Sequence, residues 1–146
     1  MRSKMFIVLG LVGAGFVAGC GGGYDAAVNI KQGDRIDTLM GTFDGALSVV
    51  HGDTKVASLE VTDGETTCTG TSTNGKYSTN GVRNKIRHNF KINCNDGRTG
   101  VVSVTINARP DGGLGGLRAN GIGIGNLSDG SKLRVVIGEM IGNLAW

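Results

Sequence analysis

The 146-residue sequence contains one proline, three cysteines and two histidines, and only 5% of its residues are aromatic. A structural zinc site needs four ligands, and neither His51 nor His88 stands at a recognised metal-ligand spacing from a cysteine. No Gly-x-Ser-x-Gly motif is present to hold a serine nucleophile on a sharp turn. We therefore expect no metal site, no bound cofactor and no enzymatic activity.

Two further catalytic patterns are missing. Paired carboxylates for hydrolysis must lie close together with one pKa raised by burial, but the aspartates of this chain stand beside glycine, where turn geometry explains them: Asp53, Asp63, Asp96, Asp111 and Asp129. The glycine-rich segment 112–116 lacks the Gly-Lys-Ser/Thr ending of a phosphate-binding loop. These absences argue against glycosidase-type and nucleotide-hydrolysing chemistry.

The longest apolar run stands at the start of the chain. Arg2 and Lys4 precede fourteen apolar or glycine residues, 5–18, in the basic and then apolar order of a secretory signal. A spanning helix needs about 20 consecutive apolar residues, and this run ends before that length. We therefore expect residues 1–19 to form an export signal that is removed.

The end of that run carries a motif. Val17-Ala18-Gly19-Cys20 resembles the lipobox of bacterial lipoproteins. The resemblance implies cleavage before Cys20, a diacylglycerol thioether on its sulfur and an acyl chain on its freed amine, so that a membrane becomes a partner through the lipid anchor. Gly21 stands where lipoproteins kept in the inner membrane of Gram-negative bacteria typically carry Asp. The resemblance thus favours the outer membrane.

Loss of the signal changes the charge balance. Without Arg2 and Lys4, the 15 basic residues fall to 13 against 12 acidic residues, which leaves no general basic field for nucleic acid. Cys68 and Cys94 then form an even pair in an oxidising compartment. We expect them to form one disulfide.

The exported part divides into two regions. Residues 20–33 begin with glycines and show little periodicity, so we expect a lipidated flexible tether. Residues 34–146 show short alternating stretches separated by turn residues, which indicates an all-β domain. We expect an antiparallel meander of six or seven strands closing into a small barrel or a two-layer sandwich.

Two hairpins are the clearest elements. A strand over 86–94 with Ile86, His88 and Phe90 inward leads through Asn95-Asp96-Gly97 to a second strand over 98–107. A strand over 121–127, with Ile122 and Ile124 inward, turns at 128–130 and returns over 132–137. Less regular strands are expected at 46–50, 55–61 and 66–72, with the turn between the first two at 51–54.

A second resemblance covers the last third of the chain. The segment 94–100, a Cys-x-Asp-Gly-Arg-x-Gly turn, followed by the glycine-alternating hairpin 121–130, is similar to a pattern in small exported bacterial β proteins of unassigned function. Because these motifs are turn chemistry, the resemblance implies fold and location and no mechanism.

The most uneven charge distribution lies between Glu65 and Asp96, where five basic residues occur with no acid. This face could contact an envelope protein, an anionic envelope glycolipid or the carboxylates of peptidoglycan. Solvation and protection of a sheet edge explain the same residues equally simply. The expected binding face consists of Lys76, Tyr77, Arg83, Lys85, Arg87 and Lys91.

Three functions follow from these features. The first is a non-enzymatic, membrane-anchored envelope lipoprotein that acts as an interaction or structural module in the periplasm or at the cell surface. The second is an inhibitor of a cell-wall hydrolase such as lysozyme, because residues 72–77 are faintly similar to the Ser-Gly-x-x-Tyr loop of lipoprotein lysozyme inhibitors. An envelope enzyme ranks third, since no acid, base and nucleophile converge in the sequence.

Overall fold

The computed structural model describes residues 23–45, 55–80, 83–110 and 117–138, and all regular structure in these ranges is β-strand. No helix in this part of the chain is long and apolar enough to cross a membrane. The strands are β1 (Tyr24–Gln32), β2 (Arg35–Gly45), β3 (Ala57–Thr62), β4 (Thr67–Ser72), β5 (Lys76–Thr79), β6 (Asn84–Cys94), β7 (Thr99–Pro110), β8 (Leu117–Leu127) and β9 (Lys132–Gly138).

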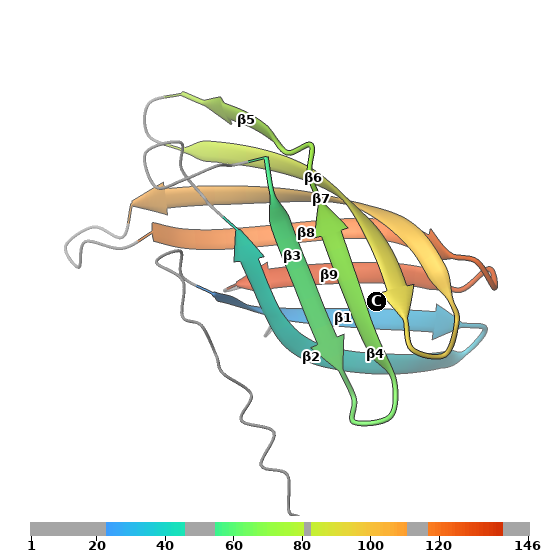
Figure 1. The fold of residues 1–146 in the computed structure, drawn as a ribbon. Helices are drawn as coiled ribbons and strands as arrows, with labels where there is room; N and C mark the ends of the chain where they lie inside the picture. Colours follow the sequence, from blue (N-terminus) through green and yellow to red (C-terminus); the bar gives the residue numbers. More distant parts are fainter. Residues whose placement is uncertain (1–22, 46–54, 81–82, 111–116, 139–146) are drawn as a thin grey trace, which may run out of the picture.

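The strands form one antiparallel sheet that closes on itself (Figure 1). Consecutive strands pair from β1 through β4 and again from β6 through β9, while β1 pairs with β9 and β4 pairs with β6. Eight strands therefore make a closed up-and-down barrel, and β5 is an additional short strand on β6. The all-β antiparallel prediction is confirmed, and the barrel is the form it takes.

Alternate side chains of each strand fill the barrel, as the period of two requires. On β6, Ile86, His88, Phe90, Ile92 and Cys94 are buried, which confirms the predicted inward face. Phe43 from β2 meets Phe90 edge to face, with ring centroids 6.2 Å apart. The inward side chains of these strands form one continuous buried cluster, so this lumen is a packed core.

The barrel closes through a short seam. β4 and β6 pair over four residues, from Cys68 opposite Cys94 to Thr71 opposite Lys91, whereas β7 and β8 pair over eleven. The predicted disulfide is confirmed between Cys68 and Cys94, which lie directly opposite each other. A covalent cross-link therefore holds the shortest pairing on which closure depends.

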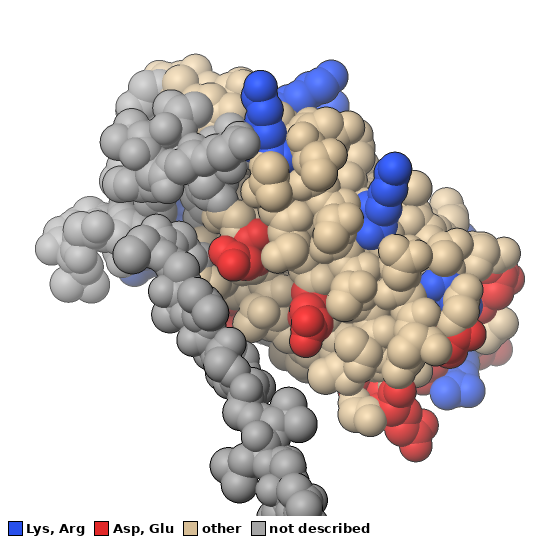
Figure 2. Space-filling model, in the orientation of Figure 1, with Lys and Arg blue, Asp and Glu red and all other residues tan. Residues whose placement is uncertain are grey.

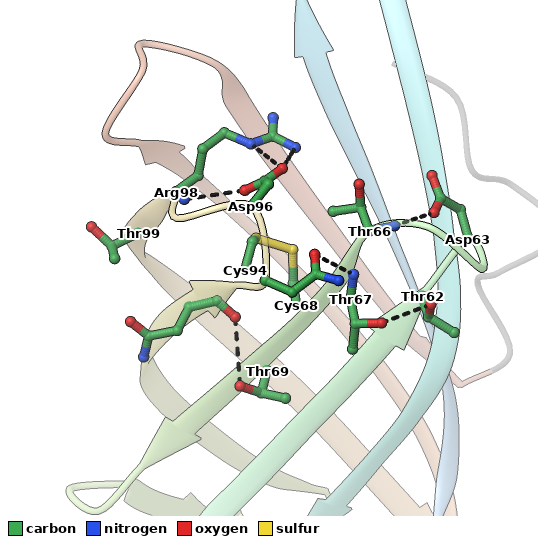
Figure 3. Close-up of a disulfide and its surroundings, with 12 residues drawn as sticks. Thr62, Asp63, Thr66, Thr67, Cys68, Thr69, Cys94, Asp96, Arg98 and Thr99 are labelled. Atoms are coloured by element: carbon green, nitrogen blue, oxygen red, sulfur yellow. Dashed lines mark hydrogen bonds and ion pairs between the residues drawn. A yellow bond between two sulfur atoms is a disulfide. The ribbon is translucent and has the colours of Figure 1, made fainter.

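Hydrogen bonds continue this seam beyond the disulfide (Figure 3). The Asn95 backbone N–H donates to the Thr67 carbonyl at 2.9 Å, and the Thr67 N–H donates back to Asn95 Oδ1 at 3.1 Å. In the same turn, Arg98 Nη2 donates to Asp96 Oδ2 at 2.6 Å, and this hydrogen bond lowers the pKa of the Asp96 carboxyl. The Cys-x-Asp-Gly-Arg-x-Gly segment is thus a structural turn.

The two ends of the barrel differ in their connections. At one end, which we call the turn end, the turns at 33–34, 63–66, 95–98 and 128–131 join consecutive strands. At the opposite end, the loop end, β1 starts, β7 and β9 finish, and β8 begins. Figure 1 shows the start of β1 on the left together with the arrowheads of β7 and β9.

The predicted boundary of the tether at residue 33 is wrong. Residues 24–32 form β1, and Ala26, Val28 and Ile30 belong to the core. β1 and β2 form a hairpin that the sequence did not reveal, because polar residues and glycine occupy inward positions of β2 and hide its alternation. The predicted strand at 46–50, the turn at 51–54 and the signal segment lie outside the described residues.

The predicted orientation of β8 is also wrong. Ile122 and Ile124 point outward, with 38% and 69% of their surface exposed, while Gly121, Gly123 and Gly125 face the interior. The reason is space. A Cβ on Gly123 would lie 2.5 Å from the Ser103 carbonyl oxygen. The glycines let β8 approach β7 closely, and the isoleucines consequently take the solvent side.

The seam predicts the effect of removing its cross-link. Replacing Cys68 and Cys94 together by alanine should lower the free energy of unfolding by about 3–4 kcal/mol, because the disulfide restricts the unfolded chain. Urea unfolding followed by circular dichroism measures this loss. A reducing agent should destabilise the native protein similarly and leave the double variant unchanged. A loss below ~1 kcal/mol would show that the closure does not depend on the disulfide.

The interior glycines predict a second effect. Gly123→Ala should lower the free energy of unfolding by about 1–3 kcal/mol, because the added methyl must push β7 and β8 apart. Ile124→Thr, an outward change one residue away, should alter it by less than ~0.5 kcal/mol. Equal unfolding midpoints for the two variants would contradict the close approach of the strands.

Candidate anion-binding surface

The structure brings most of the predicted binding face together on β5 and β6. Lys76 lies directly opposite Arg87, and Lys85 lies opposite Ser78 two pairs further along. Arg83 immediately precedes β6, and all four basic side chains are exposed. Figure 2 shows Lys and Arg side chains along its upper edge, over β5 and β6, with Asp and Glu side chains below them.

Of the other two predicted members, Tyr77 lies with these residues and Lys91 does not. Tyr77 lines a shallow depression with Lys76, Ser78, Lys85 and Arg87; its ring is half-buried against the core, and its hydroxyl donates to Asn84 Oδ1 at 2.7 Å. Lys91 is exposed on the half of β6 that pairs with β4, four residues beyond Arg87 and about 13 Å along the strand.

Sequence reasoning missed two arginines that belong to the surface. Asn84 pairs with Ala108, so Arg83, one residue earlier, lies level with Arg109 on β7. Arg109 in turn pairs directly with Arg118 on β8. Neighbouring strands lie about 4.8 Å apart. Three guanidinium groups, which we call the arginine row, thus stand side by side across β6, β7 and β8 at the loop end.

A second row of polar groups runs beside the first. Lys85 pairs with Asn107 on β7, and Asn107 pairs with Asn120 on β8. The arginine row and the two asparagines line a shallow open depression on the barrel wall formed by Arg83, Asn107, Ala108, Arg109, Arg118 and Asn120. Guanidinium forks match the oxygens of phosphate and carboxylate groups, and amides add donors beside them. The arrangement can bind an anion.

The charges of this surface oppose its own sheet pairing. Like charges directly opposite each other destabilise a sheet, yet Lys76 faces Arg87 and Arg109 faces Arg118. Within the described ranges, no ion pair joins the side chain of Arg83 or Arg109 to an acid. A local conflict of this kind is expected where a surface serves binding.

The arginine row has no signature in the sequence. Arg109 and Arg118 stand outside the acid-free run and are nine residues apart, on either side of a glycine-rich segment. Only the pairing of β7 with β8 places them together. A correct register for that hairpin, taken together with the β6–β7 register, would have revealed the row.

A buried histidine and a buried serine are hydrogen-bonded to each other inside the barrel. His88 is fully buried, and its Nδ1 is hydrogen-bonded to Ser72 Oγ at 2.9 Å. This geometry matches a nucleophile and a base, but His88 Nε2 has no hydrogen-bond partner in the described part of the chain, so no acid orients the ring. Because both residues are buried, the pair packs the core against Phe43 and Phe90.

The segment compared with the inhibitor loop, 72–77, joins the end of β4 to the start of β5. Ser72 ends β4 with a buried side chain, and Lys76 and Tyr77 begin β5. From Thr71 to Lys76 the chain advances five residues, while the paired segment of β6, from Lys91 to Arg87, covers four. The extra residue makes a bulge between β4 and β5. The Gly75 N–H donates to the Lys55 carbonyl at 3.0 Å and ties the bulge to the β3 side.

Comparisons with known proteins do not add to this geometry. No protein-family model, curated protein or solved structure matches the chain. In the residues that the structure describes, no three His, Cys, Asp or Glu side chains converge as metal ligands. The surface chemistry of the barrel is therefore the basis of the functional interpretation.

The buried histidine predicts how stability depends on pH. Burial lowers the pKa of His88, so the unfolded chain binds a proton below pH ~6.5 while the folded protein does not. Above that pH, the contribution of His88 to the free energy of unfolding should not change with pH. It should fall by up to ~1.4 kcal/mol per pH unit as the pH drops from there towards the lowered pKa.

Urea unfolding at pH values between 7.5 and 5 measures this slope. His88→Gln keeps a polar side chain in the core and removes the titration, so its profile should be flatter over the same window. Parallel profiles for the native protein and the variant would show that His88 is protonated as easily in the barrel as in the unfolded chain.

Proposed function

We propose that the chain is an exported, lipid-anchored protein of the bacterial envelope that acts without enzymatic activity as an interaction or structural module. In this proposal residues 1–19 are removed, and Cys20 carries a diacylglycerol and an N-acyl chain. The outer membrane is the favoured destination in a Gram-negative host. The barrel then presents its basic surface to an anionic component of the envelope.

One observation carries the proposal: the partition of the three cysteines. Cys68 and Cys94 are joined across the seam, which leaves Cys20 as the only cysteine outside a disulfide, at the end of a lipobox-like sequence. A structural disulfide is typical of oxidising compartments outside the cytoplasm. Export, cross-link and lipid anchor thus form one consistent account, in which each cysteine has a single role.

The arginine row supports the kind of partner. Its three side chains, with the amides of Asn107 and Asn120, suit phosphate or carboxylate groups, which are abundant on envelope lipids and glycolipids. A barrel with a packed lumen leaves its outer wall and its ends for contact. An interaction module is therefore the function that the geometry supports best.

The proposal predicts the chemistry of the mature amino terminus. Protein recovered from host membranes should begin at Cys20 with a mass increase equal to a diacylglycerol and an acyl chain, measured by intact and peptide mass spectrometry. Cys20→Ser should abolish the modification and move the protein out of the detergent phase. Ser3→Ala, inside the signal segment, is the matched control and should change neither result.

An unmodified Cys20 in the membrane-derived protein would refute the lipid anchor. The same conclusion would follow if the native protein stayed in the aqueous phase after detergent partitioning. Either result would leave the description of the barrel and its disulfide unchanged and would refute the proposed membrane location.

A further inference from the structure

The place where β1 starts fixes which end of the barrel lies nearest the anchor. β1 begins at Tyr24, four residues after Cys20, and it starts at the loop end. Four residue steps span at most about 14 Å of extended chain. If Cys20 is lipidated, as the proposed function holds, the loop end is therefore kept close to the bilayer.

The register places the arginine row at the same level as that start. Asn120 on β8 pairs with Gly138 on β9, and the preceding residue, Ile137, pairs with Ala26 on β1. Arg118 lies two residues beyond Asn120 towards the loop end. β8 and β1 are separated only by β9, which is about 10 Å across the sheet. The row and the anchored strand thus share one rim.

The opposite end has a different charge environment. At the turn end Arg98 pairs with Asp96 and lies 3.6 Å from Asp129, so its charge is matched within the protein. At the loop end the described acids are Asp25 on β1 and Asp44 on β2. β2 lies across the barrel from β7, whereas β1 is separated from β8 only by β9. The cationic part of the loop end is therefore the wall formed by β6, β7 and β8.

We propose that this wall, through Arg83, Arg109 and Arg118, docks on the phosphates of anionic lipids in the same membrane that holds the anchor. The inference rests on the proposed lipidation of Cys20 and adds an orientation and a partner to it. Arginine near an anionic leaflet is attracted electrostatically within a Debye length, and the short anchor segment allows the row to approach the leaflet to that range. The lipid phosphates then accept hydrogen bonds from the guanidinium groups of the row.

The test uses the mature lipoprotein in lipid nanodiscs. Its acylation is first checked by mass spectrometry, and it is then inserted into phosphatidylcholine discs with or without phosphatidylglycerol, each with a trace of lipid carrying a Gd³⁺ chelate on its headgroup. Relaxation enhancement of backbone amides by NMR reports proximity to the headgroups. The amides compared are those of Asn107 and Asn120 at the loop end and of Gly97 and Gly130 at the turn end.

Two variants of equal charge change complete the design. Arg83→Gln, Arg109→Gln and Arg118→Gln together remove the row. The matched control combines Arg35→Gln, Lys91→Gln and Lys132→Gln, which removes three exposed cations away from it. We expect strong enhancement at Asn107 and Asn120 and little at Gly97 and Gly130 in the anionic discs. The row variant should lose most of this difference, and the control variant should keep it.

The outcomes separate the two proposals. In a protein shown to be lipidated, equal relaxation enhancement at the two ends of the barrel would overturn the docking and leave the lipid anchor intact. The same conclusion would follow if the row variant kept the difference in enhancement between the two ends. Equal enhancement also leaves the row available to a soluble acidic protein instead of the membrane. An unmodified Cys20 overturns the proposed function and the docking with it.

Discussion

The closure of the barrel depends on the seam between β4 and β6. Every other pairing of the eight strands either joins strands that are consecutive in the chain or extends over more residue pairs. Four residue pairs hold this seam, and the disulfide fixes the pair at its turn end. Asn95 extends the contact into the neighbouring turn through hydrogen bonds to Thr67 and Glu65. Open at this seam, the sheet would expose two unpaired edges and the core between them. The packed core and the arrangement of surface residues across neighbouring strands both require that this seam stays paired.

Closure also gives the molecule two unlike ends. At the turn end the polar groups satisfy one another: Asp63 accepts from the Thr66 and Glu65 N–H groups, which lower the pKa of its carboxyl, and Arg98 is matched by carboxylates. At the loop end the arginine row brings three guanidinium groups together across three strands. The first arrangement serves stability and the second does not. This contrast is why the loop end is the candidate for a partner.

Local alternation and turn chemistry made about half of the fold predictable. The hairpin of β6 and β7 follows from inward Ile86 and Phe90 and from the turn at 95–97, and the cysteine pair followed from parity. β1 was missed because the glycines that precede it suggested a tether. The inward face of β8 was predicted the wrong way round because apolar Ile122 was expected to be buried. Of the candidate surface, the basic residues of β5 and β6 were predictable. Arg109 and Arg118 were not, because only strand pairing makes them neighbours.

The central claim is that guanidinium groups of the arginine row contact lipid phosphate when the protein is anchored through Cys20. Dipolar dephasing between ³¹P of the lipid and ¹⁵N of labelled arginine side chains, measured by solid-state NMR on the acylated protein in anionic bilayers, tests it most directly. We predict clear dephasing in the native protein and its loss when the three arginines are replaced by glutamine. Absence of dephasing in the native protein, or equal dephasing after the replacement, would contradict the account.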